Sequence, residues 1–181
     1  MTKPAPIHHL ALRVREIDQL FNSMDPTPFL NKDLDPAAET FIESWASTFP
    51  ASSCFHLTIH LEQWPTEEAR IELLTKAIHN HFGYKSELAR KKLKSFLRQG
   101  RVSLVIGIGF VSLCLLLADM IGNLGGQSVH YNIARESLTI VGWVAMWRPL
   151  QIFLYDWWPL HRQIRLYESL SSAQVKVIQG K

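Results

Sequence analysis

The run from Val102 to Gly122 constrains this chain more than any other feature of its sequence. It reads VSLVIGIGFVSLCLLLADMIG and contains one ionisable residue, Asp119. About 20 apolar residues form a helix long enough to cross the ~30 Å hydrocarbon core of a bilayer. The buried core helix of a soluble protein is the alternative, but such helices seldom run this far without a polar stripe. The sequence therefore predicts a first transmembrane helix over residues 102–122.

A second apolar segment, residues 138–160, is also long enough to span, but Arg148 and Pro149 interrupt it. Proline tends to kink a helix, and an arginine at membrane depth is energetically expensive. Two arrangements would relieve this: a kinked span with Arg148 in a protein interface or wet cavity, or a span that stops near Trp147 and continues as an interfacial helix. We predict the kinked span. Its end carries three aromatic residues suited to the headgroup level, namely Tyr155, Trp157 and Trp158.

Charge is divided unevenly along the chain. Residues 1–84 hold six basic and eleven acidic residues, whereas residues 85–101 hold seven basic and one acidic. A short basic segment beside an apolar run is typical of the cytoplasmic flank of a transmembrane helix. It is not typical of a nucleic-acid-binding protein, whose positive charge would spread over a folded face. We expect lipid headgroups to contact six side chains of this region: Arg90, Lys91, Lys92, Lys94, Arg98 and Arg101.

The flanks of the two apolar segments predict their orientation. The connecting stretch 123–137 is short and formally neutral, while the outer flanks of both segments are basic. The N-terminus has no recognisable signal peptide, and Cys54 and Cys114 fall in different segments, which fits a reducing compartment. We therefore expect a multi-pass membrane protein with both termini in the cytoplasm and the 123–137 loop outside.

Residues 1–84 have the pattern of a small cytoplasmic α/β domain. Alternating apolar residues predict strands at 9–15 and 54–62. Between them, Asp35 is expected to cap a helix that has Pro36 in its first turn. The second strand should bury Phe55, Leu57, Ile59 and Leu61 on one face, and the helix should bury Phe41, Ile42, Trp45 and Phe49.

Helices and one further strand are expected in the rest of the chain. A helix should open near Thr66 and break at Gly83, and a basic juxtamembrane helix over 85–101 should run into the first span. The tail 161–181 ends in the alternating sequence QVKVIQ, which permits a returning third strand. Two strands alone form a marginal sheet, so the alternative is completion by oligomerisation. The predicted fold class is an α/β domain of two or three strands followed by a two-helix transmembrane hairpin.

Polar residues within the apolar segments are candidate functional residues, since ionisable groups at membrane depth are rare. Arg148 would anchor a helix against a partner or, alternatively, line a transport path. In an antiparallel hairpin Arg148 lies near the level of Ser112, so Asp119, near the outer face, is too distant to pair with it. Asp156 lies near the inner surface, where Arg101 could offset its charge.

Other chemistry is weakly supported. Cys54 and His56 share a strand face with His60 and Glu62, but the set is incomplete as a metal site, and a polar outer face explains it better. His79 and His81 are two residues apart, so on a helix their side chains would point in different directions. Catalytic signatures and phosphate-binding glycine loops are not evident, and Gly107 and Gly109 are expected to aid helix packing. We predict no metal and no cofactor.

Two parts of the sequence resemble uncharacterised bacterial inner-membrane proteins. The first is DPTPF at 25–29 with LDP at 34–36, and the second is WRPL at 147–150 with YDWWP at 155–159. The resemblance implies a folded family of this layout in the bacterial inner membrane. It implies no activity, cofactor or functional residue.

The sequence favours a non-enzymatic membrane subunit or adaptor whose cytoplasmic domain binds itself or another protein. Expected partners are membrane lipids and either further copies of the chain or other membrane subunits, and not nucleic acid. An oligomeric channel or transporter component with Arg148 lining the path is the first alternative. A membrane-bound enzyme using Asp156 and His161 is the second and weaker one.

Overall fold

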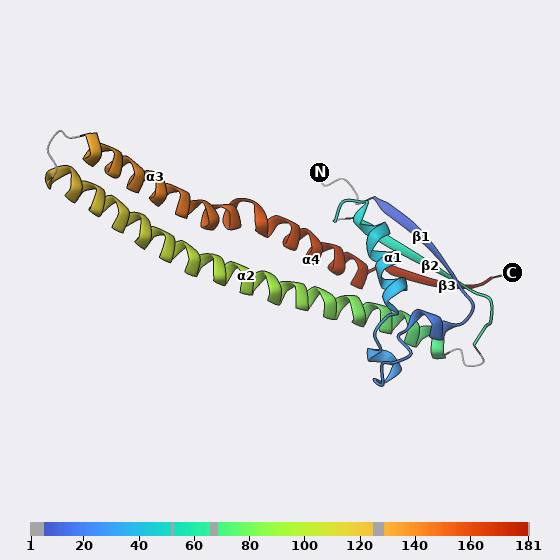
Figure 1. The fold of residues 1–181 in the computed structure, drawn as a ribbon. Helices are drawn as coiled ribbons and strands as arrows, with labels where there is room; N and C mark the ends of the chain where they lie inside the picture. The colour runs from blue at the N-terminus through green and yellow to red at the C-terminus, as the bar shows by residue number, and fades with distance from the viewer. Residues whose placement is uncertain (1–5, 52, 66–68, 125–128, 181) are drawn as a thin grey trace. The chain divides into compact units, whose positions relative to one another are not determined.

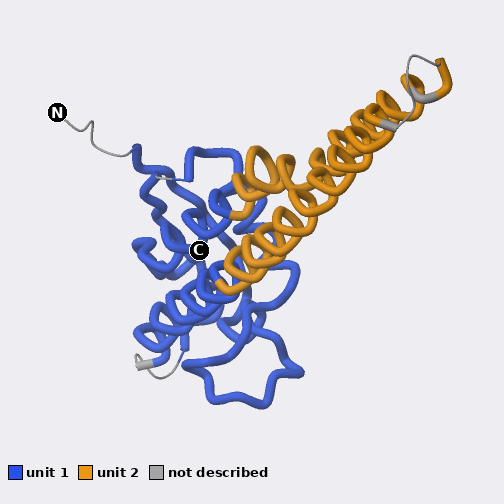
Figure 2. The backbone as a smooth tube through the Cα atoms, turned by 90° about the vertical axis from the view of Figure 1, so that its left-hand side faces the viewer, with its two compact units in different colours: residues 1–90, 161–181 blue, residues 91–160 orange. Residues whose placement is uncertain are grey.

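The structure is a computed structural model that describes residues 6–51, 53–65, 69–124 and 129–180. Figure 1 shows its helices and strands in chain order. The chain forms two compact units, coloured separately in Figure 2: unit 1 comprises residues 1–90 and 161–181, and unit 2 comprises residues 91–160. The two units are described separately below.

Unit 1 is built on a three-stranded parallel sheet. Its strands are β1 (Ile7–Val14), β2 (Cys54–Leu61) and β3 (Gln174–Gln179), in the order β1-β2-β3. Ile7 pairs with Cys54 across β1 and β2, and His56 pairs with Gln174 across β2 and β3. The α/β class and the returning C-terminal strand are thus confirmed. The end of the chain completes a sheet that begins near its start.

The strand β2 divides its side chains between an apolar and a polar face. Phe55, Leu57, Ile59 and Leu61 are each 1% exposed or less, as their alternation predicted. Trp45 from helix α1 meets Phe55 with ring centroids 5.5 Å apart, and Figure 1 shows α1 crossing the sheet. The opposite face carries His9 and His56, whose rings lie 4.8 Å apart. This is the expected polar outer face.

Helix α1 (Pro36–Ser47) begins where the sequence predicted. The Asp35 carboxylate accepts hydrogen bonds from the backbone N–H groups of Ala37 and Ala38, which satisfies donors left open at a helix start. Ile42 and Ala46 are buried. The predicted burial of Phe41 is wrong, because α1 turns that residue to the solvent side and leaves it 52% exposed.

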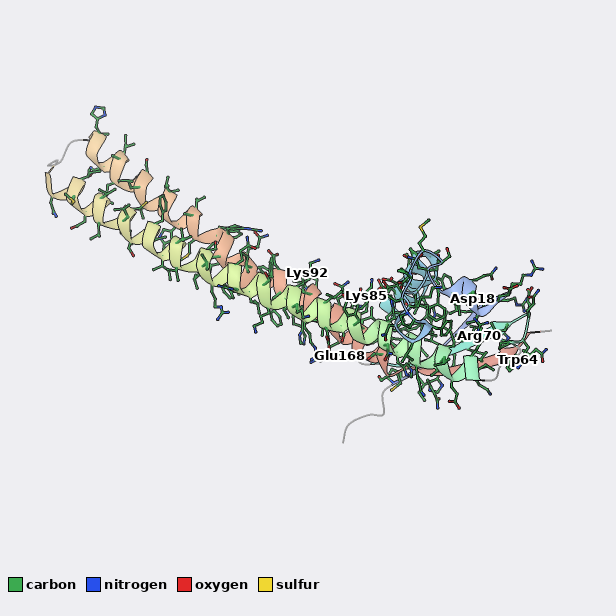
Figure 3. All side chains as sticks on the ribbon, turned by 90° about the horizontal axis from the view of Figure 1, so that it is seen from below. Asp18, Trp64, Arg70, Lys85, Lys92 and Glu168 are labelled. Carbon is green, nitrogen blue, oxygen red and sulfur yellow. The ribbon has the colours of Figure 1, made fainter. Side chains whose placement is uncertain are left out.

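Two short 3₁₀ helices precede α1, namely η1 (Ile17–Leu20) and η2 (Phe29–Asn31). The Asp25 carboxylate holds the chain in a turn, with its Oδ1 accepting from Thr27 N and its Oδ2 accepting from Asp33 N. These two backbone N–H groups lower the pKa of Asp25 below its ordinary value. Asp18 of η1 also forms an ion pair, at 3.6 Å, with Arg70 near the start of the long helix that follows β2 (Figure 3).

Helix α2 (Ala69–Leu124) is longer than expected, because the helix continues through Gly83. A glycine inside a helix costs about 1 kcal/mol relative to alanine. Here the neighbouring Ile78 and Phe82 are almost completely buried, so packing outweighs that cost. The segments predicted as separate helices before and after Gly83 are therefore one helix.

The second half of the chain is also mostly helical. Helix α3 (Val129–Gln151) leads into a π-helical segment, η3 (Ile152–Asp156), and then into α4 (Trp157–Ser171). Most of the stretch 123–137 that was expected to be a loop is therefore helix. The π segment begins three residues after Pro149, which removes a backbone donor from the helix. The helix thus passes the proline without a break.

Candidate functional site

Unit 2 presents an apolar surface along its helices. Two helical stretches, Arg70–Asn123 and Asn132–Ser171, are long and apolar enough to cross a membrane, and 17% of the most apolar window of each is buried. Figure 3 shows side chains projecting along both. Large apolar side chains that are more than half exposed include Val105, Ile106, Leu116, Ile140, Val144 and Leu154. By length and composition, both stretches are candidate membrane-spanning helices.

Small residues allow the helices of unit 2 to approach closely. A β-carbon added to Gly107 would lie 3.3 Å from Cγ of Pro149, and one added to Gly142 would lie 3.3 Å from Cβ of Cys114. One added to Gly100 would lie 2.7 Å from Cγ2 of Ile152, closer than side chains tolerate. Glycines at such contacts let two backbones pack without a side chain between them.

These contacts correct the helix register expected from the sequence. Gly107 faces Pro149, so Arg148 lies near the level of Gly107 and not of Ser112. The expected register assumed a loop over 123–137, and the helical start of α3 shifts it by more than one turn. The expected packing role is confirmed for Gly107, whereas Gly109 has no neighbouring atom within 4 Å of an added β-carbon.

Arg148 forms an ion pair with Asp156, with Nη1 and Oδ2 separated by 3.6 Å. Residues eight apart on a regular α-helix are offset by about 80°. The π segment η3 ends at Asp156, and its wider turn takes back part of that offset. The expected partner of Asp156 was Arg101. Arg148 occupies that role and directs its guanidinium along the helix toward η3.

Asp119 is exposed and accepts a hydrogen bond from Nδ2 of Asn123 at 3.3 Å. It forms no ion pair with Arg148 within the described residues. Asp119 therefore lies near the C-terminal end of α2, and Arg148 and Asp156 form a separate polar pair on the continuous helix of α3 and η3.

The six basic residues near the start of the first apolar run are all exposed. Lys91, Lys94, Arg98 and Arg101 are spaced i, i+3, i+7 and i+10, which places them on one face of α2. Lys92 lies off this face. Arg90 is engaged within unit 1, where its Nε donates to Oε1 of Glu168 at 3.1 Å. The sequence did not predict that partner, because Glu168 is distant along the chain.

The three aromatic residues expected at the headgroup level differ in exposure. Tyr155 and Trp158 are 70% and 66% exposed, whereas Trp157 is half-buried. The rings of Trp157 and Trp158 meet edge to face, 5.9 Å apart. Tyr155 and Asp156 belong to η3, so the aromatic residues and the acidic member of the ion pair lie within one turn of each other.

Unit 1 contains a polar cluster that the sequence analysis missed. Glu39 and Glu43 enter it from α1, His81 and Lys85 from α2, and Tyr167 from α4. The Lys85 ammonium group donates to Oε1 of Glu39 in an ion pair. The hydroxyl of Tyr167 accepts a hydrogen bond from Nε2 of Gln163 at 2.9 Å.

His81 lies between two carboxylates. Its side chain is 2% exposed, with Nδ1 3.2 Å from Oδ1 of Asp33 and Nε2 3.4 Å from Oε2 of Glu39. The Nε2 contact lies outside hydrogen-bond geometry, so this buried nitrogen has no well-formed partner. The backbone N–H of Leu34 also points at Nδ1, at 3.4 Å. The imidazole thus connects the segment before α1 to the Glu39 carboxylate.

Burial and charge shift the pKa values of this cluster in opposite directions. Burial raises the pKa of Glu43 above its ordinary value, and interaction with Glu39 adds to the rise although Tyr167 opposes it. Burial alone would also raise the pKa of Glu39, but the hydrogen bond and charge of Lys85 lower it overall. The pKa of Lys85 rises because Glu39 outweighs its partial burial. Glu43 is therefore the carboxyl group that retains a proton more readily.

A sequence signal for this cluster existed. On α1, residues 39, 42, 43 and 46 follow the i, i+3, i+4, i+7 spacing of a buried helix face, and residues 42 and 46 are core residues. Two glutamates thus occupy positions where apolar residues are expected. On α2, His81 and Lys85 follow the buried Ala77 at i+4 and i+8, so polar side chains again occupy a helix face where apolar residues are expected.

Of the residues considered as metal ligands, Cys54, His56 and His79 line one cavity, and His60, Glu62 and His81 are not among its lining residues. A hollow of about 650 Å³ is lined by Cys54, His56 and His79, together with hydroxyl-bearing side chains. His79 Nε2 lies 2.8 Å from the carbonyl oxygen of Ala173, so it donates there. Within the described residues, no group of three or more His, Cys, Asp or Glu side chains could hold a metal ion.

Comparisons with known proteins leave the chain without relatives that could assign a role. No protein-family model matches it, and no curated protein or solved structure matches it. A function must therefore be argued from the residues themselves.

Proposed function

We propose that the protein is a non-enzymatic integral membrane subunit or adaptor of the bacterial inner membrane. In this proposal, unit 2 crosses the bilayer twice as a helical hairpin, and unit 1 lies in the cytoplasm and binds a second copy or another membrane subunit. The exposed apolar surface of unit 2 carries the proposal, because soluble proteins rarely expose contiguous apolar patches of more than a few hundred Å².

Unit 1 contains both the residues before unit 2 and the residues after it, which supports two crossings of the membrane. Residues before and after unit 2 belong to one folded unit, because β3 pairs with β2. One folded unit lies on one side of a bilayer, so a chain that leaves it through the membrane must return. Four basic residues form an exposed face of α2, namely Lys91, Lys94, Arg98 and Arg101. This face supports a cytoplasmic location, because each basic residue near anionic lipid headgroups contributes ~1 kcal/mol to membrane binding.

The pairing of Arg148 with Asp156 supports a structural role for these residues. A guanidinium group that lined a transport path would face water or a moving ion. Here the carboxylate of Asp156 offsets the charge of Arg148, and the guanidinium group points toward η3, which also contains aromatic residues. Long basic side chains near a membrane surface commonly extend toward it in this way. We therefore propose no transport role.

Membrane insertion and topology can be tested with single-cysteine variants. In a Cys54→Ser, Cys114→Ser background, Asn123→Cys should react with a membrane-impermeant maleimide on intact spheroplasts. Ser172→Cys should react only after lysis and is the matched control. Labelling of Ser172→Cys on intact cells, or release of the protein by alkaline carbonate, would contradict the proposed topology.

The adaptor role is tested by the mass of the intact assembly. Gentle extraction into native nanodiscs, followed by native mass spectrometry, should give either a homo-oligomer or a complex with other subunits. A bare monomer would contradict the proposal. Arg148→Leu should leave ion flux unchanged in reconstituted vesicles, and loss of flux in an intact assembly would favour a channel instead.

A further inference from the structure

Glu39 and Glu43 occupy the junction of α1, α2 and α4 in unit 1. Within the described residues, the titratable groups placed against them are His81 and Lys85 from α2, Tyr167 from α4, and Asp33 beyond His81 from the segment before α1. Lys85 is the cation of fixed charge among them, and the imidazole of His81 is the other group able to carry positive charge. These groups lie next to one another, so a proton bound by one of the two glutamates affects the others.

The balance of charge in this junction favours one bound proton. Glu39 and Glu43 are four residues apart on one helix face, where two carboxylates repel each other. Lys85 forms its ion pair with Glu39, which leaves Glu43 without a direct cation. The Oε1 atom of Glu43 is buried and has no hydrogen-bond partner. A proton on the Glu43 carboxyl group would remove its charge and supply a donor toward Glu39.

We propose that the Glu39–Glu43 pair is a proton-binding switch that couples the packing of α1 against α2 and α4 to the surrounding pH. With one proton bound, Glu43 donates to Glu39 and Lys85 balances the remaining negative charge. When that proton passes to water, two carboxylates face one lysine, and Tyr167 loses a neutral neighbour. The junction then loosens at α1.

The sign of the pH effect follows from the direction of the Glu43 shift. Its pKa in the folded protein lies above the ordinary value of 4.5, so the folded state binds the proton more tightly than the unfolded state. The stabilisation is fully present below 4.5 and is lost as the pH rises through the folded value. The opening of α1 should therefore increase with pH over a range above 4.5.

This inference does not depend on the proposed membrane role, because every residue of the switch belongs to unit 1. It does concern α2 and α4, through which the chain leaves and re-enters unit 1. A pH-dependent change in their packing would therefore regulate the unit proposed to bind partners.

Hydrogen exchange of the full-length protein in lipid nanodiscs tests the switch. After correction for intrinsic exchange, protection of α1 amides should fall by about fivefold as the pH rises, the change expected for one net hydrogen bond. Glu43→Gln mimics the protonated acid and should abolish this dependence. Glu72→Gln changes an exposed glutamate and should retain it.

Infrared difference spectroscopy provides a second measurement. A protonated-carboxyl band should disappear with rising pH in the wild type and in Glu72→Gln, and be absent in Glu43→Gln. Glu39→Gln removes the repulsion between the two carboxylates and should weaken the pH dependence while the burial of Glu43 retains part of it, which covers the case in which Glu43→Gln does not fold. A wild-type α1 with pH-independent protection, or a Glu43→Gln protein that keeps the wild-type dependence, would overturn the proposal.

Discussion

Arg148 and Asp156 are eight residues apart on one continuous helical path, yet their charged groups are 3.6 Å apart. The π turn that ends at Asp156 reduces the angle between the two side chains around the helix, so the ion pair is coupled to the local geometry.

The mutual dependence of Arg148 and Asp156 predicts non-additive mutations. Arg148→Leu and Asp156→Leu should each destabilise unit 2, because each leaves one charge without its partner. The double variant should recover about 1 kcal/mol relative to the sum of the singles. Thermal unfolding in nanodiscs measures this coupling, and strictly additive effects would show that the contact contributes nothing.

Close packing at glycine predicts a position-specific effect in unit 2. Gly107→Leu should destabilise by about 1–3 kcal/mol, because its side chain would press against Pro149. Gly109→Leu is a matched control two residues away, since nothing lies near its β-carbon. Equal behaviour of the two variants in a detergent unfolding assay would contradict the observed helix contact.

Lys85 predicts a pH-dependent loss of stability. The lowered pKa of Glu39 gives stability that is present above the ordinary value of 4.5 and lost as the pH falls through the folded value. Lys85→Gln should therefore cost about 1 kcal/mol at neutral pH, the upper range for a partly exposed pair, and little in acid. Denaturant melts at several pH values check this. Lys76→Gln, an exposed lysine on α2, should show no such dependence.

The C-terminal part of unit 1 should stabilise its N-terminal part. Leu170→Ala removes a side chain that is completely buried and should cost about 2–5 kcal/mol. Because β3 pairs with β2, the loss should appear as faster hydrogen exchange in β2, more than 100 residues away in sequence. Leu88→Ala, at a position 42% exposed, should leave β2 protection nearly unchanged. Unaltered β2 exchange in Leu170→Ala would show that the two parts fold independently.

Local sequence patterns predicted which helices and strands form better than they predicted where those helices and strands begin and end. The alternation in β2 and the cap at Asp35 were sufficient, because side-chain period and capping depend on a few adjacent residues. The predicted break at Gly83 is wrong, because the burial of Phe82 beside it outweighs the low helix propensity of glycine. The start of α3 was missed because a polar stretch can be helical when its neighbours extend the helix.

The candidate sites show a similar division. Exposure of the basic residues followed from their charge, but the pairing of Arg90 with Glu168 joins positions that only the fold brings together. The polar cluster depends in the same way on α1, α2 and α4 meeting at one point. The ion pair of Arg148 required knowledge of the π turn, which no simple helical spacing contains.

The late position of β3 in the sequence has a consequence for biosynthesis. The ribosome makes β1 and β2 first, then the long apolar stretch, and β3 only at the end. During that interval β2 has one unpaired edge, which is the kind of strand that pairs with wrong partners. Completion of the sheet must therefore wait until the apolar helices have been synthesised. Until then the nascent chain would depend on rapid insertion into the membrane or on a chaperone that covers the unpaired edge of β2.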